Sequence, residues 1–219
     1  FSFNFWQPVL QEISFDVAHG KSIALVGSTG SGKSSIINLL TRFYEINGGQ
    51  ILLDGEPIEE YSLSYLRKSI GLVLQDVFLF RGSIRDNITL GNPDITDQQV
   101  KAAAELVGAN RFIEQLPGGY NYNVMERGNT LSVGQRQLIS FVRAMVYQPA
   151  ILILDEATSS VDSETEELIQ QAIDKIMEGR TSVVVAHRLS TIQKADQILV
   201  LEKGKIVERG NHEQLLAMG

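Results

Sequence analysis

Cysteine is absent from this sequence of 219 residues. Its absence excludes disulfide bonds, zinc sites built from thiolates and catalysis by a thiolate, and it is typical of a reducing compartment. Long apolar runs are missing too, since stretches such as SVVVA and AILIL fall far short of the ~20 residues that a membrane-spanning helix requires. The first residues, FSFNFW, alternate like a strand with no visible leader, so we expect the chain to be a fragment of a longer polypeptide.

Positive charge is scarce. The sequence has 19 Lys and Arg against 26 Asp and Glu, which gives a net charge of −7, and it contains no run of basic residues. This balance argues against a protein that binds nucleic acid. With 43% hydrophobic and 21% charged residues, the composition is that of a globular protein with a substantial core, and the length suits one domain or two compact subdomains.

Alternating strand and helix patterns indicate an α/β fold. Residues 1–26 alternate like strands, and a helical apolar period runs from Lys33 to about Tyr44. Gly and Asn mark a hairpin at 47–58. Later elements are predicted as strands at 69–76, 150–157 and 181–187, a helix at 163–178 and a hairpin at 197–210. We therefore expect a mixed, mainly parallel sheet core with an N-terminal antiparallel β subdomain.

The middle of the chain, about 77–147, has a different character and is predicted to be an α-helical subdomain inserted into the core. Residues 96–116 form an amphipathic helix pattern with Thr96 as its N-cap. Residues 131–148 form a second helix, which Pro149 is expected to stop.

The segment GSTGSGKSS follows the apolar strand SIALV and opens the first predicted helix. It matches the phosphate-loop pattern G-x-x-x-x-G-K-[ST] in the strand–loop–helix setting that this pattern requires. Glycines let backbone N–H groups point at phosphate oxygens, and the helix start adds partial positive charge. Lys33 would add a full charge near the β- and γ-phosphates, and the Ser34 hydroxyl would bind Mg²⁺. The residues predicted to bind the nucleotide here are Gly27, Ser28, Thr29, Gly30, Ser31, Gly32, Lys33, Ser34 and Ser35.

A second acidic element, AILILDEATSS, ends an apolar strand on Asp155 and Glu156. A buried parallel strand delivers its last residues to the carboxyl edge of the sheet, where ligands bind in such folds. Asp155 is therefore predicted to hold Mg²⁺ through water, beside Ser34. Glu156 is predicted to orient or deprotonate the attacking water.

The segment LSVGQRQLISFVRAMVYQP, just before that strand, resembles the LSGGQ signature of ATP-binding-cassette (ABC) proteins, with Val133 at the first glycine position. Ser132 suits the N-cap of the helix that begins there, and a helix N-terminus can receive a phosphate. The resemblance implies that Ser132, Gly134 and Gln135 contact the γ-phosphate of an ATP molecule held by the phosphate loop of a second cassette.

The same resemblance implies roles for residues elsewhere. Gln75, which ends IGLVLQ, resembles the Q-loop glutamine, which contacts Mg²⁺ or the attacking water and links the site to the membrane domains. Asp162, in SSVD, resembles part of the D-loop at the dimer interface. His187, after TSVVVA, resembles the switch histidine, which contacts the γ-phosphate and positions the water. The segments MERG, Met125–Gly128, and QDVFLFRGSIRDNI are similar to those of exporter-type cassettes.

An aromatic ring near the N-terminus stacks on adenine in this family. Stacking needs only a flat ring at the right height. Phe5 and Trp6 are both candidates, and the strand pattern favours Phe5.

The resemblance covers essentially the whole chain and implies the ATP-binding and ATP-hydrolysing domain of an ABC exporter. Two cassettes would close around two ATP molecules, with Mg²⁺ as cofactor, and drive membrane domains expected to precede Phe1. The expected location is the cytoplasmic face of a membrane. The second cassette could be identical or different, and Val133 could face a weaker partner site or be a tolerated variant. The missing membrane domain would choose the substrate.

Two other functions are open at this point. A soluble ABC ATPase acting in nucleic-acid repair or translation shares the loop, the signature and the acidic strand, but it would be expected to carry a basic face, coiled-coil or zinc insertions, or tandem cassettes. A nucleotide switch or kinase outside the family would need no SVGQ helix, and it would carry base-specificity motifs that the sequence lacks.

Overall fold

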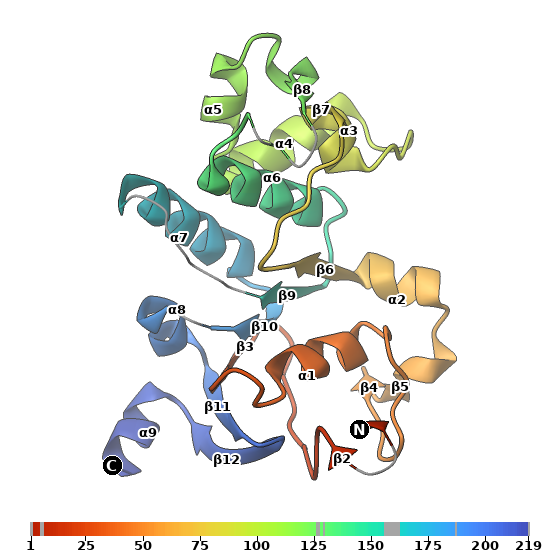
Figure 1. The fold of residues 1–219 in the computed structure, drawn as a ribbon, viewed down its shortest axis with the longest axis vertical. Coiled ribbons are helices and arrows are strands. Elements are labelled where there is room, and N and C mark those ends of the chain that lie inside the picture. The colour runs from red at the N-terminus through yellow and green to blue at the C-terminus, as the bar shows by residue number, and fades with distance from the viewer. Residues whose placement is uncertain are drawn as a thin grey trace. The chain divides into compact units, whose positions relative to one another are not determined.

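The computed structural model describes residues 2–4, 7–125, 128, 130–155, 163–186 and 188–218 of the chain. These residues form two compact units. The first unit takes the described residues of 1–72, 150–157 and 179–219, and the second takes those of 73–149 and 158–178. Figure 1 labels most of the helices and strands of both units.

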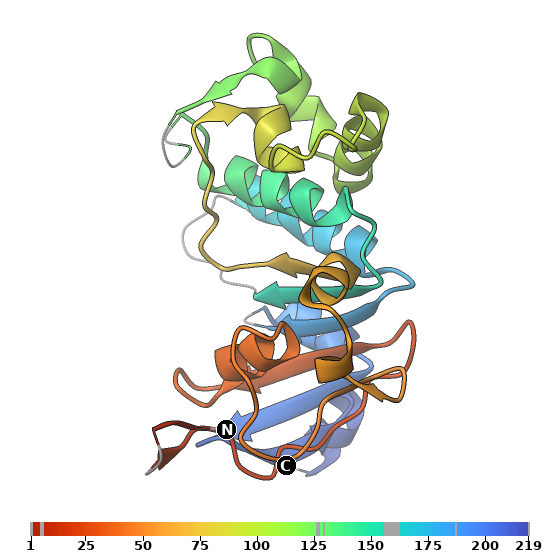
Figure 2. The ribbon, with the colours of Figure 1, turned by 90° about the vertical axis from the view of Figure 1, so that its right-hand side faces the viewer.

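The first unit is built on a sheet of order β12-β11-β3-β10-β9-β6 (Figure 2). Its strands are β3 (Ser22–Gly27), β6 (Ile70–Val73), β9 (Ile151–Asp155), β10 (Thr181–Val185), β11 (Gln197–Glu202) and β12 (Lys205–Gly210). β10 runs parallel to β3 and β9, whereas β11 runs parallel to β3 and antiparallel to β12. The mixed, mainly parallel sheet confirms the predicted fold class.

The strand register brings two predicted site segments to one edge of this sheet. Val185 on β10 pairs with Asp155 on β9 and with Leu25 on β3. β3 continues beyond Leu25 to Gly27, which pairs with Leu201 on β11. The start of the phosphate loop and Asp155 therefore emerge together at the carboxyl edge of the sheet, where parallel α/β sheets bind their ligands.

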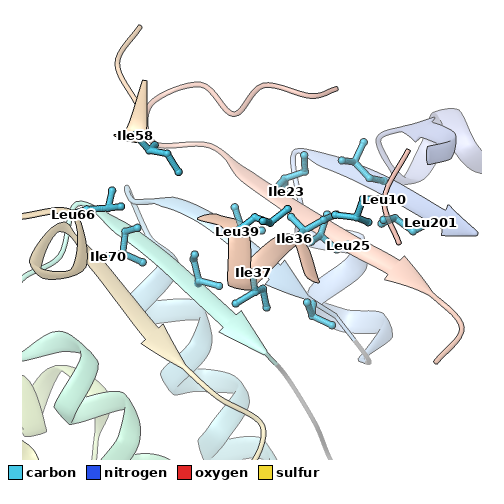
Figure 3. Packing of buried hydrophobic residues seen from close by; sticks show 14 residues of the cluster. Leu10, Ile23, Leu25, Ile36, Ile37, Leu39, Ile58, Leu66, Ile70 and Leu201 are labelled. Carbon is cyan, nitrogen blue, oxygen red and sulfur yellow. The ribbon is translucent and has the colours of Figure 1, made fainter. Parts of the chain in front are cut away.

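A hydrophobic cluster joins helix α1 (Lys33–Leu40) to the sheet. Ile36, Ile37 and Leu39 project from the helix, and Ile23 and Leu25 from β3 belong to the same cluster (Figure 3). Full burial of one such side chain stabilises the fold by about 1.5–3 kcal/mol. The cluster therefore fixes the helix whose first turn carries the end of the phosphate loop.

Short antiparallel pairs complete the β part of this unit. β1 (Ser2–Asn4) pairs with β2 (Gln7–Pro8), and β4 (Leu52–Leu53) pairs with β5 (Glu56–Pro57). The segment Val9–Val17, which the alternation predicted as strand, belongs to no strand; its side chains alternate in exposure, but its backbone joins no sheet. The remaining elements are η1 (Ile58–Glu60), α2 (Leu63–Ser69), α8 (Leu189–Lys194) and α9 (His212–Met218).

The second unit is mainly helical. Helices α4 (Asp97–Val107), α6 (Val133–Met145) and α7 (Ser163–Met177) pack against one another, and α3 (Ile84–Thr89) packs on α6. The apolar face of α6 is buried, with Leu138, Phe141, Val142 and Met145 inside. The remaining elements are α5 (Asn110–Gln115), η2 (Gly119–Asn121) and the pair β7 (Gly82–Ser83) and β8 (Asn123–Val124).

Helix α1 is shorter than predicted and ends at Leu40. Arg42 takes the left-handed conformation with φ 49°, and the N–H of Phe43 donates back to the carbonyl of Asn38. This is the hydrogen bonding of a Schellman C-cap, with arginine where glycine is usual. The guanidinium of Arg42 donates to the carbonyls of Ile58 and Tyr61, which offsets the cost of that backbone conformation.

The two helices predicted in the middle of the chain are also corrected. The single helix expected at 96–116 is split, because Gly108 ends α4 in the left-handed conformation with φ 80°. Thr96 caps α4 as predicted. Helix α6 ends at Met145, before Pro149, and Gln148 already has a positive φ of 49°.

The short helices α2, α3, α8 and α9 went unpredicted because they are too short to show an apolar period. Helices α2 and α3 begin at a serine N-cap, Ser62 and Ser83. Ser83 and Asp86 form a capping box, and the hydrogen bonds from Ser83 lower the pKa of Asp86. Among the described residues, no helix has both the length and the apolar character needed to cross a membrane.

Candidate nucleotide-binding site

The predicted phosphate loop joins β3 to α1, and its path depends on glycine at two positions. Gly27 has a φ of 154° and Gly32 a φ of 112°, which residues with a side chain rarely adopt. A Cβ atom on Gly27 would lie 2.3 Å from the carbonyl oxygen of Leu201, and one on Gly32 would lie 2.6 Å from Cδ2 of Leu10. The loop therefore keeps this path only with glycine at both positions.

Helix α1 begins directly after the loop with no side-chain cap, since its N-cap residue is Gly32. The first N–H groups of a helix have no partner inside the helix, and they carry the positive end of its dipole. Ser34, in this first turn, exposes its side chain, whereas Ser31 is buried. An uncapped helix start of this kind can bind phosphate oxygens.

Lys33 places a buried cation at the same point. Its Nζ donates to the carbonyl oxygens of Gly27 at 2.7 Å and Ser28 at 3.0 Å, and it lies 3.5 Å from Oγ of Ser31. The residue is only 8% exposed. Burial lowers the pKa of Lys33, while the negative charge of Asp155 acts to raise it. The positive charge is thus poorly solvated, which favours an anionic ligand beside it.

Asp155 completes this half of the site. It ends β9 half-buried, at the sheet edge from which the phosphate loop emerges, and its charge reaches Lys33. The hydroxyl of Ser34 and the carboxylate of Asp155 both offer the hard oxygen atoms that Mg²⁺ prefers. A Mg²⁺ ion usually keeps several waters and uses substrate phosphates beside one or two carboxylates, which fits this small donor set.

The predicted signature residues gather at the start of α6 in the second unit. Oγ of Ser132 accepts the N–H of Gln135 at 3.1 Å, and Oε1 of Gln135 accepts the N–H of Ser132 at 3.0 Å. This capping box confirms Ser132 as the N-cap. Val133, which replaces a glycine of the LSGGQ pattern, is 47% exposed, so its side chain meets no steric barrier in this unit.

Gly134 is predicted to be irreplaceable for a packing reason. A Cβ atom at this buried position would lie 1.9 Å from Cγ2 of Thr165 on α7. Gly134→Ala should therefore lower the free energy of unfolding by about 1–3 kcal/mol, as overpacked cores do. Chemical denaturation measures the loss. Thr165→Ser removes the obstructing methyl and keeps the hydroxyl, so the double variant should regain most of it; an unaltered loss would show that another contact is responsible.

Gln75 is exposed and follows β6 in the second unit. The segment after it is anchored by Arg143 of α6, which donates to the carbonyl of Phe78 at 3.2 Å and to that of Asn87 at 2.8 Å. The amide side chain of Asn87 bonds both the N–H and the carbonyl of Phe80. Burial lowers the pKa of Arg143. The sequence analysis did not predict a role for Arg143. The only feature that could have indicated one is its charge within an otherwise apolar stretch of α6.

Comparisons with known proteins agree on one family. The family model described as "ABC transporter" matches residues 10–159. The chain is 54% identical over 218 residues to the "Probable multidrug resistance ABC transporter ATP-binding/permease protein YheH" of Bacillus subtilis. It is 50% identical over 212 residues to an "ATP-dependent lipid A-core flippase" of Legionella pneumophila. A solved bacterial Atm1-family ABC exporter with ATP bound superposes with a TM-score of 0.91 at 41% identity and covers 100% of this chain.

The chain belongs to the ABC transporter family. It has the P-loop NTPase fold of an exporter-type cassette, as the sequence predicted. The alignments cover 100% and 97% of this cassette but only 32% and 36% of the Bacillus and Legionella proteins. They cover 38% of the Atm1-family chain. The cassette therefore spans about a third of the length of the curated relatives it matches.

Several predicted site residues lie outside the described part of the cassette, and their roles stay predictions. They are Phe5, Trp6, Glu156, Asp162 and His187. Within the described part, the first unit brings the phosphate loop and Asp155 together, and the second unit holds Gln75 and the start of α6.

Proposed function

We propose that this cassette powers export across a membrane by binding Mg²⁺-ATP at Gly27–Ser35 and hydrolysing it. The observation that carries the proposal is the buried ammonium of Lys33, held over the loop carbonyls at the uncapped start of α1 and within reach of the charge of Asp155. A triphosphate supplies the negative charge that this arrangement lacks. Backbone N–H groups of the loop would bind the phosphates, and Phe5 or Trp6 would stack on adenine.

Mg²⁺ would be held by Ser34 and, through water, by Asp155, with Gln75 as a further ligand. Asp155 ends β9, and the loop that leads to Ser34 leaves β3 at the same edge of the sheet, which supports their sharing one ion. When bound, the ion neutralises charge on the phosphate oxygens. Glu156, directly after Asp155, would take a proton from the attacking water, and His187 would position that water.

A second cassette is proposed to complete each ATP site. Ser132, Gly134 and Gln135 lie at a capped helix start in the second unit, and the family resemblance makes them contacts for the γ-phosphate of the partner's ATP. Asp162 would cross the same interface. Alone, the cassette is expected to be monomeric or weakly associating, because half of each site is missing.

Membrane domains are the other proposed partners, and they would hold the cassette at the cytoplasmic face of a membrane. The relative named as an ATP-binding/permease protein supports such a fusion. Phe78 and Phe80 follow Gln75, each residue is about half exposed, and their ring centroids lie 5.0 Å apart in an edge-to-face arrangement. We propose that this pair contacts the membrane domain, because aromatic residues are enriched at protein–protein interfaces. The second unit would be the inserted helical subdomain predicted at about 77–147.

The direct test uses the full polypeptide reconstituted in lipid vesicles. ATP hydrolysis should require Mg²⁺ and stop when EDTA removes the ion, while DNA and RNA should have no effect on the rate. Hydrolysis that persists in EDTA would contradict the metal assignment. Stimulation by nucleic acid would instead support a soluble ABC ATPase, which the comparisons do not favour.

A further inference from the structure

A tight turn outside the recognised motifs lies against the phosphate loop. Glu202 at the end of β11 pairs with Lys205 at the start of β12, which leaves Lys203 and Gly204 as a two-residue turn. Both have positive φ, 47° and 78°, as hairpins of this type require. The side chain of Lys203 is exposed, whereas Gly204 is buried. The buried half of the turn therefore faces the protein.

Both the N–H and the carbonyl of Gly204 form hydrogen bonds with other segments of the chain. Its N–H donates to the carbonyl of Ser31 at 3.0 Å, and its carbonyl accepts the N–H of Gln11 at 2.9 Å. One residue of the turn thus ties the phosphate loop to the N-terminal segment Val9–Gln11.

The turn, the phosphate loop and the segment Val9–Gln11 pack so closely that a side chain on either glycine would clash. A Cβ atom on Gly204 would lie 2.0 Å from the carbonyl oxygen of Val9 and 2.9 Å from its carbonyl carbon. One on Gly32 would meet Cδ2 of Leu10 at 2.6 Å and Cα of Gly204 at 3.7 Å. Because the obstacles at Gly204 are backbone atoms, no side-chain movement can relieve them.

β11 supports the other end of the loop as well. Leu201 pairs with Gly27, and its carbonyl oxygen occupies the space where a Cβ atom on Gly27 would lie. The first glycine of the loop therefore rests on the end of β11, and the carbonyl of Ser31 is held by the turn that follows.

We propose that the Lys203–Gly204 turn is a positioning element for nucleotide phosphate. In a trans peptide the carbonyl and the following N–H point in opposite directions. Holding the Ser31 carbonyl toward Gly204 therefore aims the N–H of Gly32 away from the turn, toward the side on which the phosphates would sit. This inference rests on the proposed role of Gly27–Ser35, and it makes Gly204 a residue that acts on ATP through the loop.

The chain offers a matched control. Asp54 and Gly55 form the two-residue turn between β4 and β5, with φ values of 52° and 87°. A Cβ atom on Gly55 would meet no atom within 4 Å. Gly55→Ala and Gly204→Ala therefore introduce the same left-handed backbone strain, and only the second pushes on the phosphate loop and its neighbours.

In the full polypeptide, Gly204→Ala should raise the Kd for ATP, corrected for the folded fraction, by about tenfold or more, whereas Gly55→Ala should change it by less than about twofold. Isothermal titration gives the Kd, and thermal unfolding without nucleotide gives the folded fraction. Loss of stability alone does not move the corrected Kd. A Gly204→Ala protein that binds ATP as tightly as Gly55→Ala overturns the proposal.

A leucine pair covers the case in which Gly204→Ala does not fold. Leu10 and Leu66 are buried in the same cluster, and Figure 3 shows them at opposite ends of it. Leu10→Ala loosens the contact with Gly32 and should raise the Kd for ATP, whereas Leu66→Ala should not. Equal Kd values for the two would overturn the proposal. Lys33→Ala serves as the reference variant. If Lys33→Ala binds ATP normally, the phosphate-loop assignment itself fails. If Lys33→Ala binds ATP weakly while the Gly204 and Leu10 variants bind it normally, only the proposed role of the turn is refuted.

Discussion

Glu156→Gln is expected to leave ATP binding intact and to lower steady-state hydrolysis by about 100- to 10,000-fold, the usual contribution of a general base. Glutamine matches the size of glutamate but cannot take a proton from the attacking water. Since hydrolysis would remove the γ-phosphate that is proposed to bridge the two cassettes, the variant should accumulate as an ATP-bound dimer. Turnover, the Kd for ATP and the hydrodynamic size with ATP measure the three effects.

A suitable control is Glu208→Gln, which removes an exposed carboxylate from β12 and should leave all three measurements unchanged. Turnover of Glu156→Gln equal to that of the parent protein would refute the base assignment. Loss of ATP binding together with turnover would show that Glu156 supports the fold or the nucleotide instead of acting on water.

Lys33→Ala is expected to weaken ATP binding by about tenfold to a hundredfold or more, since a hydrogen bond to a charged group contributes about 1.5–3 kcal/mol. The variant removes the cation that donates to the carbonyls of Gly27 and Ser28. Lys21→Ala is the control, because Lys21 precedes the other end of β3 and its ammonium pairs with exposed Asp196 at 2.9 Å. Isothermal titration should separate the two variants; tight binding by Lys33→Ala would contradict the assignment.

The same lysine predicts a pH dependence. Burial lowers the pKa of Lys33 in the folded protein, so the unfolded chain keeps this proton to higher pH. The charge therefore costs stability at neutral pH, and this cost disappears as pH rises from the folded pKa to the unfolded one. Phosphate favours the charged form, so the Kd for ATP should rise as Lys33 loses its proton at alkaline pH. Lys33→Ala should lack this dependence.

Structural features that depend on residues close together in the chain could be predicted from the sequence. The phosphate loop was predicted because its glycines and Lys33 act within one strand–loop–helix unit. The caps at Thr96 and Ser132 were predicted because the hydroxyl bonds an N–H only three residues later. The Asp155 position followed as well, since an apolar parallel strand has to end at the carboxyl edge of its sheet.

Features that depend on distant residues escaped prediction, and so did one local helix break. Helix α1 ends early because Arg42 donates to carbonyls of η1 and Tyr61, which local helix propensity cannot register. The break at Gly108 was overlooked because the amphipathic pattern continues on both sides of it. Arg143 gave no motif, although its hydrogen bonds hold the segment after Gln75.

The sequence by itself determined that this protein is an ABC cassette with a phosphate loop, an acidic strand end and a capped signature helix, because each motif is a short run with its own chemistry. Only the tertiary structure decided that the charge of Asp155 reaches Lys33 and that Gly204 holds the Ser31 carbonyl. The physical reason is that strand register and backbone packing set these contacts between residues far apart in the chain. A glycine that reads as a hairpin turn in sequence is, in the fold, a support of the phosphate loop.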